Sequence, residues 1–322
     1  MTVSRIRSGH ASSHGRWRGE PVLTREIIEA EARRLGATRF GVGDLKLFEG
    51  EDPRRDPKMI CPKAKCIVGF GTPVPRGLYK TMAEGAQFYT YTQLGVKALD
   101  EEYYEVFLFR MASVIEDAGY DACLQRTTPN LRVKGDQETN PEVVDTYELK
   151  YASPVEPGKP APDIMIDFGK AARACGIGCA GRYGRVVNRE YGPFMRYAFI
   201  VTDAPLETNA PYAESLCEGC DACVTACPAK CIDAAGGLDT WSCSVYYRGA
   251  LGSNPFMTDE FLKDDPDRAK ILAGEKRFTA EEARAMYPRL KFLPRTQWGY
   301  APCLCGKKCD LACYRHLTGR EV

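Results

Sequence analysis

Four cysteines and a proline follow one another in a single short run, Cys217, Cys220, Cys223, Cys227 and Pro228. The spacing C-x2-C-x2-C-x3-C-P is typical of a loop that holds a [4Fe–4S] cube, with the fourth cysteine bound to a second cluster. A zinc ion usually takes its ligands from two separated pairs of cysteine or histidine. The run therefore predicts an iron–sulfur site, with zinc and disulfide bonds as the alternatives.

The whole chain is rich in cysteine and nearly neutral. It has fifteen cysteines in 322 residues and a formal net charge of +1. Because oxidation of the thiols would destroy a cluster, we expect a reducing, cytoplasmic location. The near-zero charge gives no overall attraction to nucleic acid, so no nucleic-acid partner is expected. No stretch approaches the ~20 apolar residues that span a bilayer, so no membrane span is expected either.

The first twenty residues carry four arginines and no apolar segment. A secretory signal needs such a segment, so residues 1–20 are predicted to be a flexible tail.

The amino-terminal half alternates helical and strand patterns. Apolar spacing predicts a helix capped by Thr24 and ended by Gly36, and a long helix over about 94–118. Runs rich in β-branched and aromatic residues predict strands at 39–42, 66–70, 121–124 and 197–202. This alternation predicts an α/β or α+β core. The polar, proline-rich stretch 126–162 is long enough to be a lid or a binding loop.

A glycine-rich segment occupies residues 175–184, with glycines at 176, 178, 181 and 184. It contains G-x-G-x-x-G, but it follows a predicted helix (166–174) and not a strand, so a dinucleotide site is disfavoured. Two interpretations remain: close approach of the backbone to a bulky partner, or a tight turn that only positions its neighbours.

The order of these motifs resembles a known superfamily. The segment AARACGIGCAGRYGRVVNREYGPFMRYAFIVTDAPL, followed by CEGCDACVTACP, is similar to the core shared by reductive dehalogenases and epoxyqueuosine reductases. The resemblance implies a nitroreductase-like, cobalamin-binding α/β (α+β) core over residues 21–210. It also implies a bacterial ferredoxin-like module with two [4Fe–4S] clusters over 211–322, containing an inserted helical segment at 248–302. Helices are predicted within that segment at 266–273 and 279–286.

The resemblance also implies ligands for two clusters that exchange their outlying cysteines. The first cluster would take Cys217, Cys220, Cys223 and Cys313, and the second would take Cys227, Cys243, Cys305 and Cys309. The second run lacks the expected proline and contains one extra thiol, so Cys303 is an alternative to Cys305. Cys231 is left over and is expected to be a packed thiol.

For cobalamin, the resemblance implies backbone contacts from the glycine-rich segment and contacts from two side chains nearby. The residues are Gly176, Gly178, Gly181, Arg182 and Tyr191. An aspartate ahead of that segment would be the catalytic acid; Asp163 is the candidate and Asp167 the fallback. An aspartate in this position is also a common helix cap.

The principal functional hypothesis is an enzyme, a cobalamin-dependent oxidoreductase similar to reductive dehalogenases. Its two clusters would relay electrons from an external low-potential donor, such as ferredoxin or flavodoxin, to a corrinoid that reduces a small-molecule substrate. One alternative is a corrinoid-free electron-transfer or activation protein for a partner enzyme. A second is an epoxyqueuosine reductase acting on tRNA, disfavoured by the neutral charge and by the nine residues that follow Cys313, which leave no room for a helical-repeat tRNA-binding domain.

Overall fold

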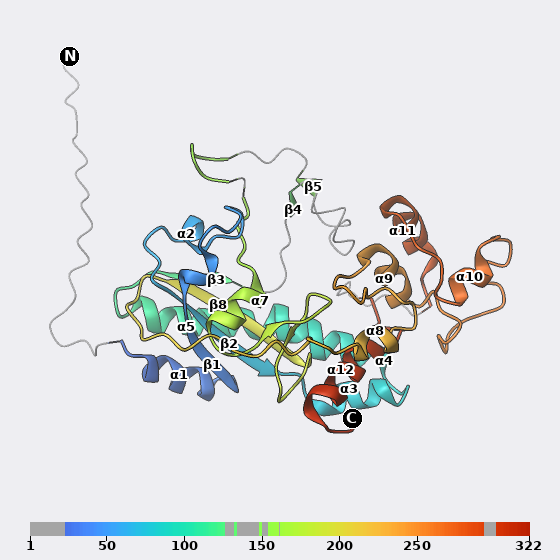
Figure 1. Ribbon diagram of the computed structural model, residues 1–322, viewed down its shortest axis with the longest axis horizontal. Coiled ribbons are helices and arrows are strands. Elements are labelled where there is room, and N and C mark those ends of the chain that lie inside the picture. Colours follow the sequence, from blue (N-terminus) through green and yellow to red (C-terminus); the bar gives the residue numbers. More distant parts are fainter. Residues whose placement is uncertain (1–22, 126–131, 134–147, 150–153, 161, 293–300) are drawn as a thin grey trace, which may run out of the picture.

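The computed structural model describes residues 23–125, 132–133, 148–149, 154–160, 162–292 and 301–322 (Figure 1). The predicted tail 1–20 and most of the predicted loop 126–162 lie outside these residues. No helix in the described ranges is both long and apolar enough to cross a bilayer.

A four-stranded antiparallel sheet organises the amino-terminal half (Figure 1). Its strands lie in the order β1 (Arg39–Asp44), β2 (Cys66–Pro73), β8 (Met195–Thr202) and β3 (Ala122–Gln125). The central strands β2 and β8 are buried along nearly their whole length, which explains why their sequences are mostly apolar rather than alternating. All four predicted strands are present.

A long helical rod and a shorter helix, α1 (Arg25–Arg34), cover one face of the sheet. The rod consists of α4 (Phe88–Thr90), a π-helical stretch η2 (Tyr91–Tyr103) and α5 (Tyr104–Glu116). Phe70 and Phe107 meet edge to face at the centre of this layer, with ring centroids 5.0 Å apart. The rod begins six residues before the helix predicted at 94, because η2 and α4 extend it toward the amino terminus.

The other face of the sheet carries η1 (Leu45–Phe48), α2 (Pro57–Ile60) and α7 (Phe168–Ala174). The end of α7 approaches β1 very closely: a β-carbon on Gly41 would lie 1.9 Å from the carbonyl oxygen of Cys175. Glycine in this strand therefore permits close approach of another backbone segment. With helices on both faces of one sheet, the predicted mixed helix and sheet class is confirmed.

The cysteine-rich part lies beside one end of the sheet (Figure 1). It contains α8 (Ala222–Ala226), α9 (Thr240–Tyr247), α10 (Arg268–Leu272), α11 (Ala280–Met286), the 3₁₀ helix η4 (Tyr287–Arg289) and α12 (Lys308–Thr318). Both helices predicted in the inserted segment are present, and α11 begins with a capping box between Thr279 and Glu282. Two short pairs of strands, β4 (Arg132–Val133) with β5 (Glu148–Leu149) and β6 (Cys179–Ala180) with β7 (Val186–Val187), complete the described sheets.

One apolar cluster crosses the predicted boundary at residue 210. Tyr79 of α3 (Arg76–Ala83) stacks on Phe194 with ring centroids 4.0 Å apart, and Tyr314 of α12 packs against both rings. The amino-terminal core and the carboxy-terminal helix therefore share buried surface. The division into 21–210 and 211–322 remains a prediction.

Candidate metal centre

Cys217 and Cys220 lie in the turn that leads into α8, Cys223 lies within that helix and Cys227 ends it. The carboxy-terminal helix α12 packs against α8. This packing brings cysteines separated by almost a hundred positions in the sequence into one region.

The first group of thiols consists of Cys217, Cys220, Cys223 and Cys313, called group one below. Burial is the largest influence on Cys313 and raises its pKa; Asp310 raises it further, followed by Cys217, Cys223 and Cys220. Charged thiols influence one another's ionisation when they lie in the same region. Together with the packing of α12 on α8, this places Cys313 in the same region as the three cysteines of the run.

The second group consists of Cys227, Cys243, Cys305 and Cys309, called group two below. Burial raises the pKa of Cys309 most strongly, and Cys305 and Cys243 add to the effect. Burial also raises the pKa of Cys305, with a smaller contribution from Cys227. Three of the four, all except Cys309, line the same apolar cluster around Val245 and Tyr246.

The two groups are the two ligand sets that the resemblance implies, and the assignment of these eight cysteines to two clusters remains a prediction. No group of three or more His, Cys, Asp or Glu side chains in the described ranges is gathered to hold a single metal ion. Sulfurs around one zinc ion would lie roughly 3.8 Å apart, from Zn–S bonds of about 2.3 Å. A cube has separate corners and takes one thiolate at each iron.

Two further thiols lie next to these groups. Cys303 is fully buried, and its sulfur lies 3.2 Å from Met82 Sδ and 3.4 Å from the carbonyl oxygen of Phe88. This contact with the helices near the sheet favours Cys305 over Cys303 as the member of group two. The thiol of Cys231 hydrogen-bonds to Cys227 and, as the largest cause, lowers the pKa of Cys227 to about 6.

The surroundings of both groups suit clusters that carry negative charge. The backbone N–H of Arg182 donates to Cys217 Sγ at 3.3 Å, and the backbone N–H of Cys231 donates to Cys227 Sγ at 3.3 Å. In addition, the Nε of Arg182 is buried and has no acceptor in the described part of the chain. Donors aimed at cysteine sulfurs, together with a buried donor that lacks an acceptor, fit sulfur-rich clusters.

The glycine-rich segment packs against the chain itself. A β-carbon on Gly176, Gly178 or Gly181 would lie 2.8, 2.8 or 2.9 Å from the carbonyl oxygens of Ala210, Val187 and Arg185. Gly176 also has φ +70°, which favours glycine. These contacts support the tight-turn interpretation, and the three positions do not form an open cradle for cobalamin.

The two side chains predicted to contact cobalamin lie in different surroundings. Arg182 donates through Nη2 to the carbonyl oxygens of Cys217 and Cys220, at 3.2 and 2.8 Å. Tyr191 is half-buried, and burial followed by a hydrogen bond with Glu190 raises its pKa. Its backbone N–H donates to the side-chain oxygen of Asn188 at 2.8 Å, which fixes the turn. Arg182 thus belongs with group one, while Tyr191 packs on the sheet side.

The two candidate acids have different roles. Asp167 caps α7, accepting from the backbone N–H of Lys170 at 2.9 Å, and it lies 3.6 Å from Arg55. Asp163 is exposed and has no hydrogen-bond or ion-pair partner among the described residues. The helix-cap interpretation therefore applies to Asp167. Asp163 caps no helix in the described ranges.

A buried polar chain beside the cysteines was not expected from the sequence. Tyr183 donates to Asp310 Oδ1 at 2.7 Å, and Lys307 Nζ lies 3.4 Å from Asp310 Oδ2. Burial alone would raise the pKa of Asp310, but Lys307, Arg185 and the Tyr183 hydrogen bond together lower it. The sequence does place Lys307 and Asp310 among closely spaced cysteines. That spacing does not show that the two charged side chains are buried.

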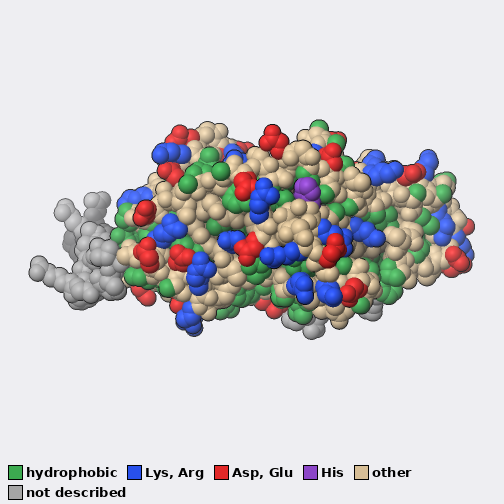
Figure 2. Space-filling model, turned by 60° about the horizontal axis from the view of Figure 1, so that its bottom comes forward, with side chains coloured by type: hydrophobic (Ala, Val, Ile, Leu, Met, Phe, Trp, Pro, Cys, Tyr) green, Lys and Arg blue, Asp and Glu red, His purple; other side chains and the backbone are tan. Residues whose placement is uncertain are grey.

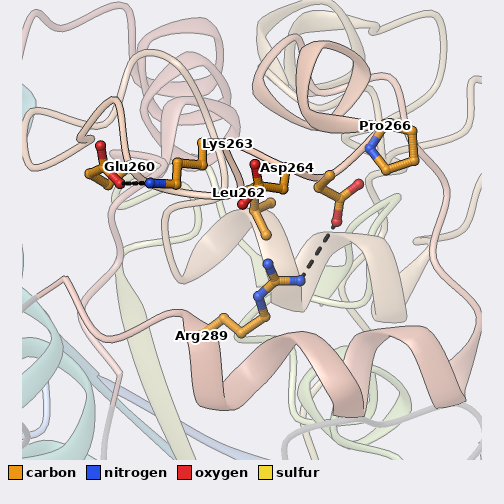
Figure 3. Close-up of a pocket in the computed structure, with 7 residues that line it drawn as sticks. Glu260, Leu262, Lys263, Asp264, Pro266 and Arg289 are labelled. Carbon is orange, nitrogen blue, oxygen red and sulfur yellow. Dashed lines mark hydrogen bonds and ion pairs between the residues drawn. The ribbon is translucent and has the colours of Figure 1, made fainter.

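A surface hollow of about 340 Å³ lies in the inserted segment (Figure 3). Its lining is mostly charged, and Arg289 reaches toward Asp265 at 3.6 Å. No predicted site residue lines this hollow.

Comparison with known sequences identifies relatives. No known family profile matches the chain. It is 26% identical to the epoxyqueuosine reductase of Bacillus subtilis over 226 residues, covering 68% of this chain and 48% of the relative. It is 31% identical to that of Lactococcus garvieae over 116 residues, covering 36% and 31%. The chain thus spans about half or less of the length of these relatives.

The solved structures similar to this chain are epoxyqueuosine reductases and reductive dehalogenases, and their sequence identities and TM-scores are low. Epoxyqueuosine reductase from Streptococcus thermophilus has a TM-score of 0.44 at 18% identity, covering 84% of this chain and 67% of that one. An epoxyqueuosine reductase solved with a modified tRNA-Tyr stem loop has a TM-score of 0.45 at 17% identity, covering 91% and 81%. A reductive dehalogenase described in terms of B12-dependent dehalogenation has a TM-score of 0.44 at 17% identity, covering 69% and 27%.

These comparisons correct one expectation. The expectation of a small-molecule substrate without a nucleic-acid partner is contradicted, because the proteins that this chain resembles in sequence are named for a modified nucleoside of tRNA. Net charge is a sum over the whole chain and does not describe one local surface. The predicted superfamily resemblance is confirmed: this chain is a relative of the epoxyqueuosine reductases.

Proposed function

We propose that this chain is an oxidoreductase of the epoxyqueuosine reductase type, which reduces a modified nucleoside in tRNA. The sequence relationship to epoxyqueuosine reductases carries this proposal. The two groups of four cysteines support it, since an enzyme that reduces a bound substrate needs a route for electrons. The relationship favours this function over the dehalogenase-like one.

The proposed route consists of two [4Fe–4S] clusters, one on group one and one on group two. Each cube passes a single electron. Group one contacts the glycine-rich segment through the hydrogen bonds of Arg182 with Cys217 and Cys220. Electrons would therefore leave the relay on the side that faces the sheet-containing core.

The proposed second cofactor is cobalamin, which when bound supplies a strongly reducing metal centre. Gly176, Gly178 and Gly181 face this chain's own carbonyl oxygens, so other residues would have to hold the corrin. The chain's own proposed contribution to the reaction is a proton from the carboxyl group of Asp163, which is exposed and has no partner among the described residues.

A tRNA substrate places the proposed reaction in the cytoplasm. Figure 2 shows basic and acidic side chains intermingled on one face of the molecule, without a large area of a single sign. We therefore expect few phosphate contacts on this face.

The test uses the full chain, purified without oxygen and reconstituted with iron, sulfide and hydroxocobalamin. With a chemical reductant and tRNA that contains epoxyqueuosine, nucleoside mass spectrometry is expected to show the reduced nucleoside, queuosine. The Asp163→Asn variant is expected to keep iron, corrinoid and tRNA binding but to lose most turnover, whereas Asp167→Asn is the matched helix-cap control.

Three results would overturn parts of the proposal. Loaded protein that binds no tRNA and forms no product refutes the function. Iron without retained corrinoid favours the electron-transfer alternative. About four irons per chain, instead of the roughly eight that two cubes contain, refutes the relay.

A further inference from the structure

Arg182 lies within the glycine-rich segment and contacts the turn that carries the first cysteines. Its backbone N–H donates to Cys217 Sγ at 3.3 Å, and its Nη2 donates to the carbonyl oxygens of Cys217 and Cys220. The same nitrogen lies 3.2 Å from Asp221. Main-chain and side-chain donors of one residue thus converge on group one.

The guanidinium is not fully satisfied by these contacts. Only 13% of the Arg182 side chain is exposed, and its Nε is buried without an acceptor in the described ranges. An unsatisfied buried donor costs about 1–3 kcal/mol, and more for a charged group. Asp221 relieves little of this cost. Its side chain is 64% exposed, so solvent screens its attraction to the guanidinium.

An acceptor for Nε has to lie within hydrogen-bond distance of it, and the described residues supply none. The chemistry of group one supplies one, because four thiolates around an iron–sulfur cube bring both cysteine sulfurs and inorganic sulfides into the region. Sulfide and thiolate sulfurs accept hydrogen bonds, and a charged donor makes the stronger bond.

We propose that Arg182 is a positioning residue for the group-one cluster, donating its Nε–H to a cluster sulfur and raising that cluster's reduction potential. The inference rests on the proposed function only in requiring the cluster. A fixed positive charge and a hydrogen bond both stabilise the extra electron that the cube takes up on one-electron reduction. Arg182 would thereby set the potential at the end of the relay nearest the glycine-rich segment.

The test is a redox titration of the full reconstituted chain, followed by EPR without tRNA or corrinoid. Arg182→Gln removes the charge and the Nε donor, and it is expected to lower the potential of one cluster by about 59 mV, a tenfold change for a one-electron couple. Arg182→Lys keeps the charge without the Nε donor and is expected to show a smaller decrease. The second cluster keeps its potential in both variants.

Arg284→Gln is the matched control. Arg284 is likewise partly buried with an unpartnered Nε, but it lies on α11 over the ring of Trp241, 5.0 Å from its centroid. It is expected to leave the group-one potential unchanged.

Unchanged potentials in Arg182→Gln with full iron content overturn the inference, as does an equal shift in Arg284→Gln. If Arg182→Gln loses its iron, Arg182→Lys decides: retained clusters with the wild-type potential and EPR line shape overturn the inference. Wild-type protein that assembles no cluster refutes the proposed function itself, which separates that failure from this one.

Discussion

The Asp100–Arg196 ion pair joins the helical rod to the central strand of the sheet, and its removal gives a quantitative prediction. Asp100 lies on η2 with 2% of its side chain exposed, and Arg196 lies on β8 with 13% exposed. Nε of Arg196 donates to Asp100 Oδ1 at 2.8 Å, and its Nη2 donates to the other carboxylate oxygen. Burial alone would lower the pKa of Arg196, but Asp100 outweighs it and raises the pKa.

Asp100→Asn keeps the size of the side chain but leaves a buried guanidinium without its counter-charge. Breaking a buried pair from one side costs about 3–5 kcal/mol. For cooperative unfolding of a chain of 322 residues, an unfolding entropy of about 2.1 cal/mol/K per residue gives roughly 0.7 kcal/mol per degree. The melting temperature is therefore expected to fall by about 4–7 °C.

The assay is thermal unfolding followed by circular dichroism, on matched cluster-loaded preparations kept free of oxygen. Glu29→Gln is the control, because its pair with Arg33 is exposed on α1 and is worth less than about 1 kcal/mol. Replacing both partners together, as Asp100→Leu with Arg196→Met, is expected to recover most of the loss. A single variant that melts within 1 °C of wild type, or a double variant no better than the single one, would refute the reasoning.

Three further predictions concern the cysteine groups and the sheet. Cys313→Ser is expected to halve the iron content by emptying group one, whereas Cys303→Ser keeps all of it; equal losses would contradict the grouping. Gly41→Ala is expected to destabilise the chain by more than 3 kcal/mol, because its β-carbon would meet a carbonyl at 1.9 Å, and Gly77→Ala, with nothing within 4 Å, serves as the denaturation control. In metal-free protein Cys227 is expected to alkylate with a midpoint near pH 6, because a neighbouring thiol stabilises its thiolate. Its stabilising contribution is present above the unfolded pKa and is lost as pH falls through 6; a midpoint above pH 8 would contradict this.

Much of the sheet could be predicted because its buried strands consist mostly of apolar residues. Strand β8 is mostly apolar, apart from Arg196 and Thr202, and has both faces covered. The spacing of Cys217 to Cys227 is typical of a loop that holds a cube. The pairing of distant cysteines could be anticipated only through the resemblance, since spacing does not show which helices pack together.

Other features depend on contacts that a linear pattern does not contain. Gly176 and Gly181 could accommodate either a cofactor or another part of the chain, and only the fold shows that they face carbonyl oxygens of the protein. Arg182 was expected on the cofactor side, but its donors point to the cysteine turn. Lys307 and Asp310 lie inside a cysteine-rich run whose spacing says nothing about which charged side chains are buried.

The strand order has a consequence for synthesis on the ribosome. Strand β3 pairs only with β8 among the described strands, and β8 begins roughly 70 residues after β3 ends, at Gln125. At about 5–20 residues per second, β3 leaves the peptidyl-transferase centre some 4–14 seconds before its neighbour. During that interval β2 has only β1 beside it. Closure of the sheet is thus delayed until just before the first cysteine run is translated, so the nascent core and the thiols proposed to hold iron become available almost together.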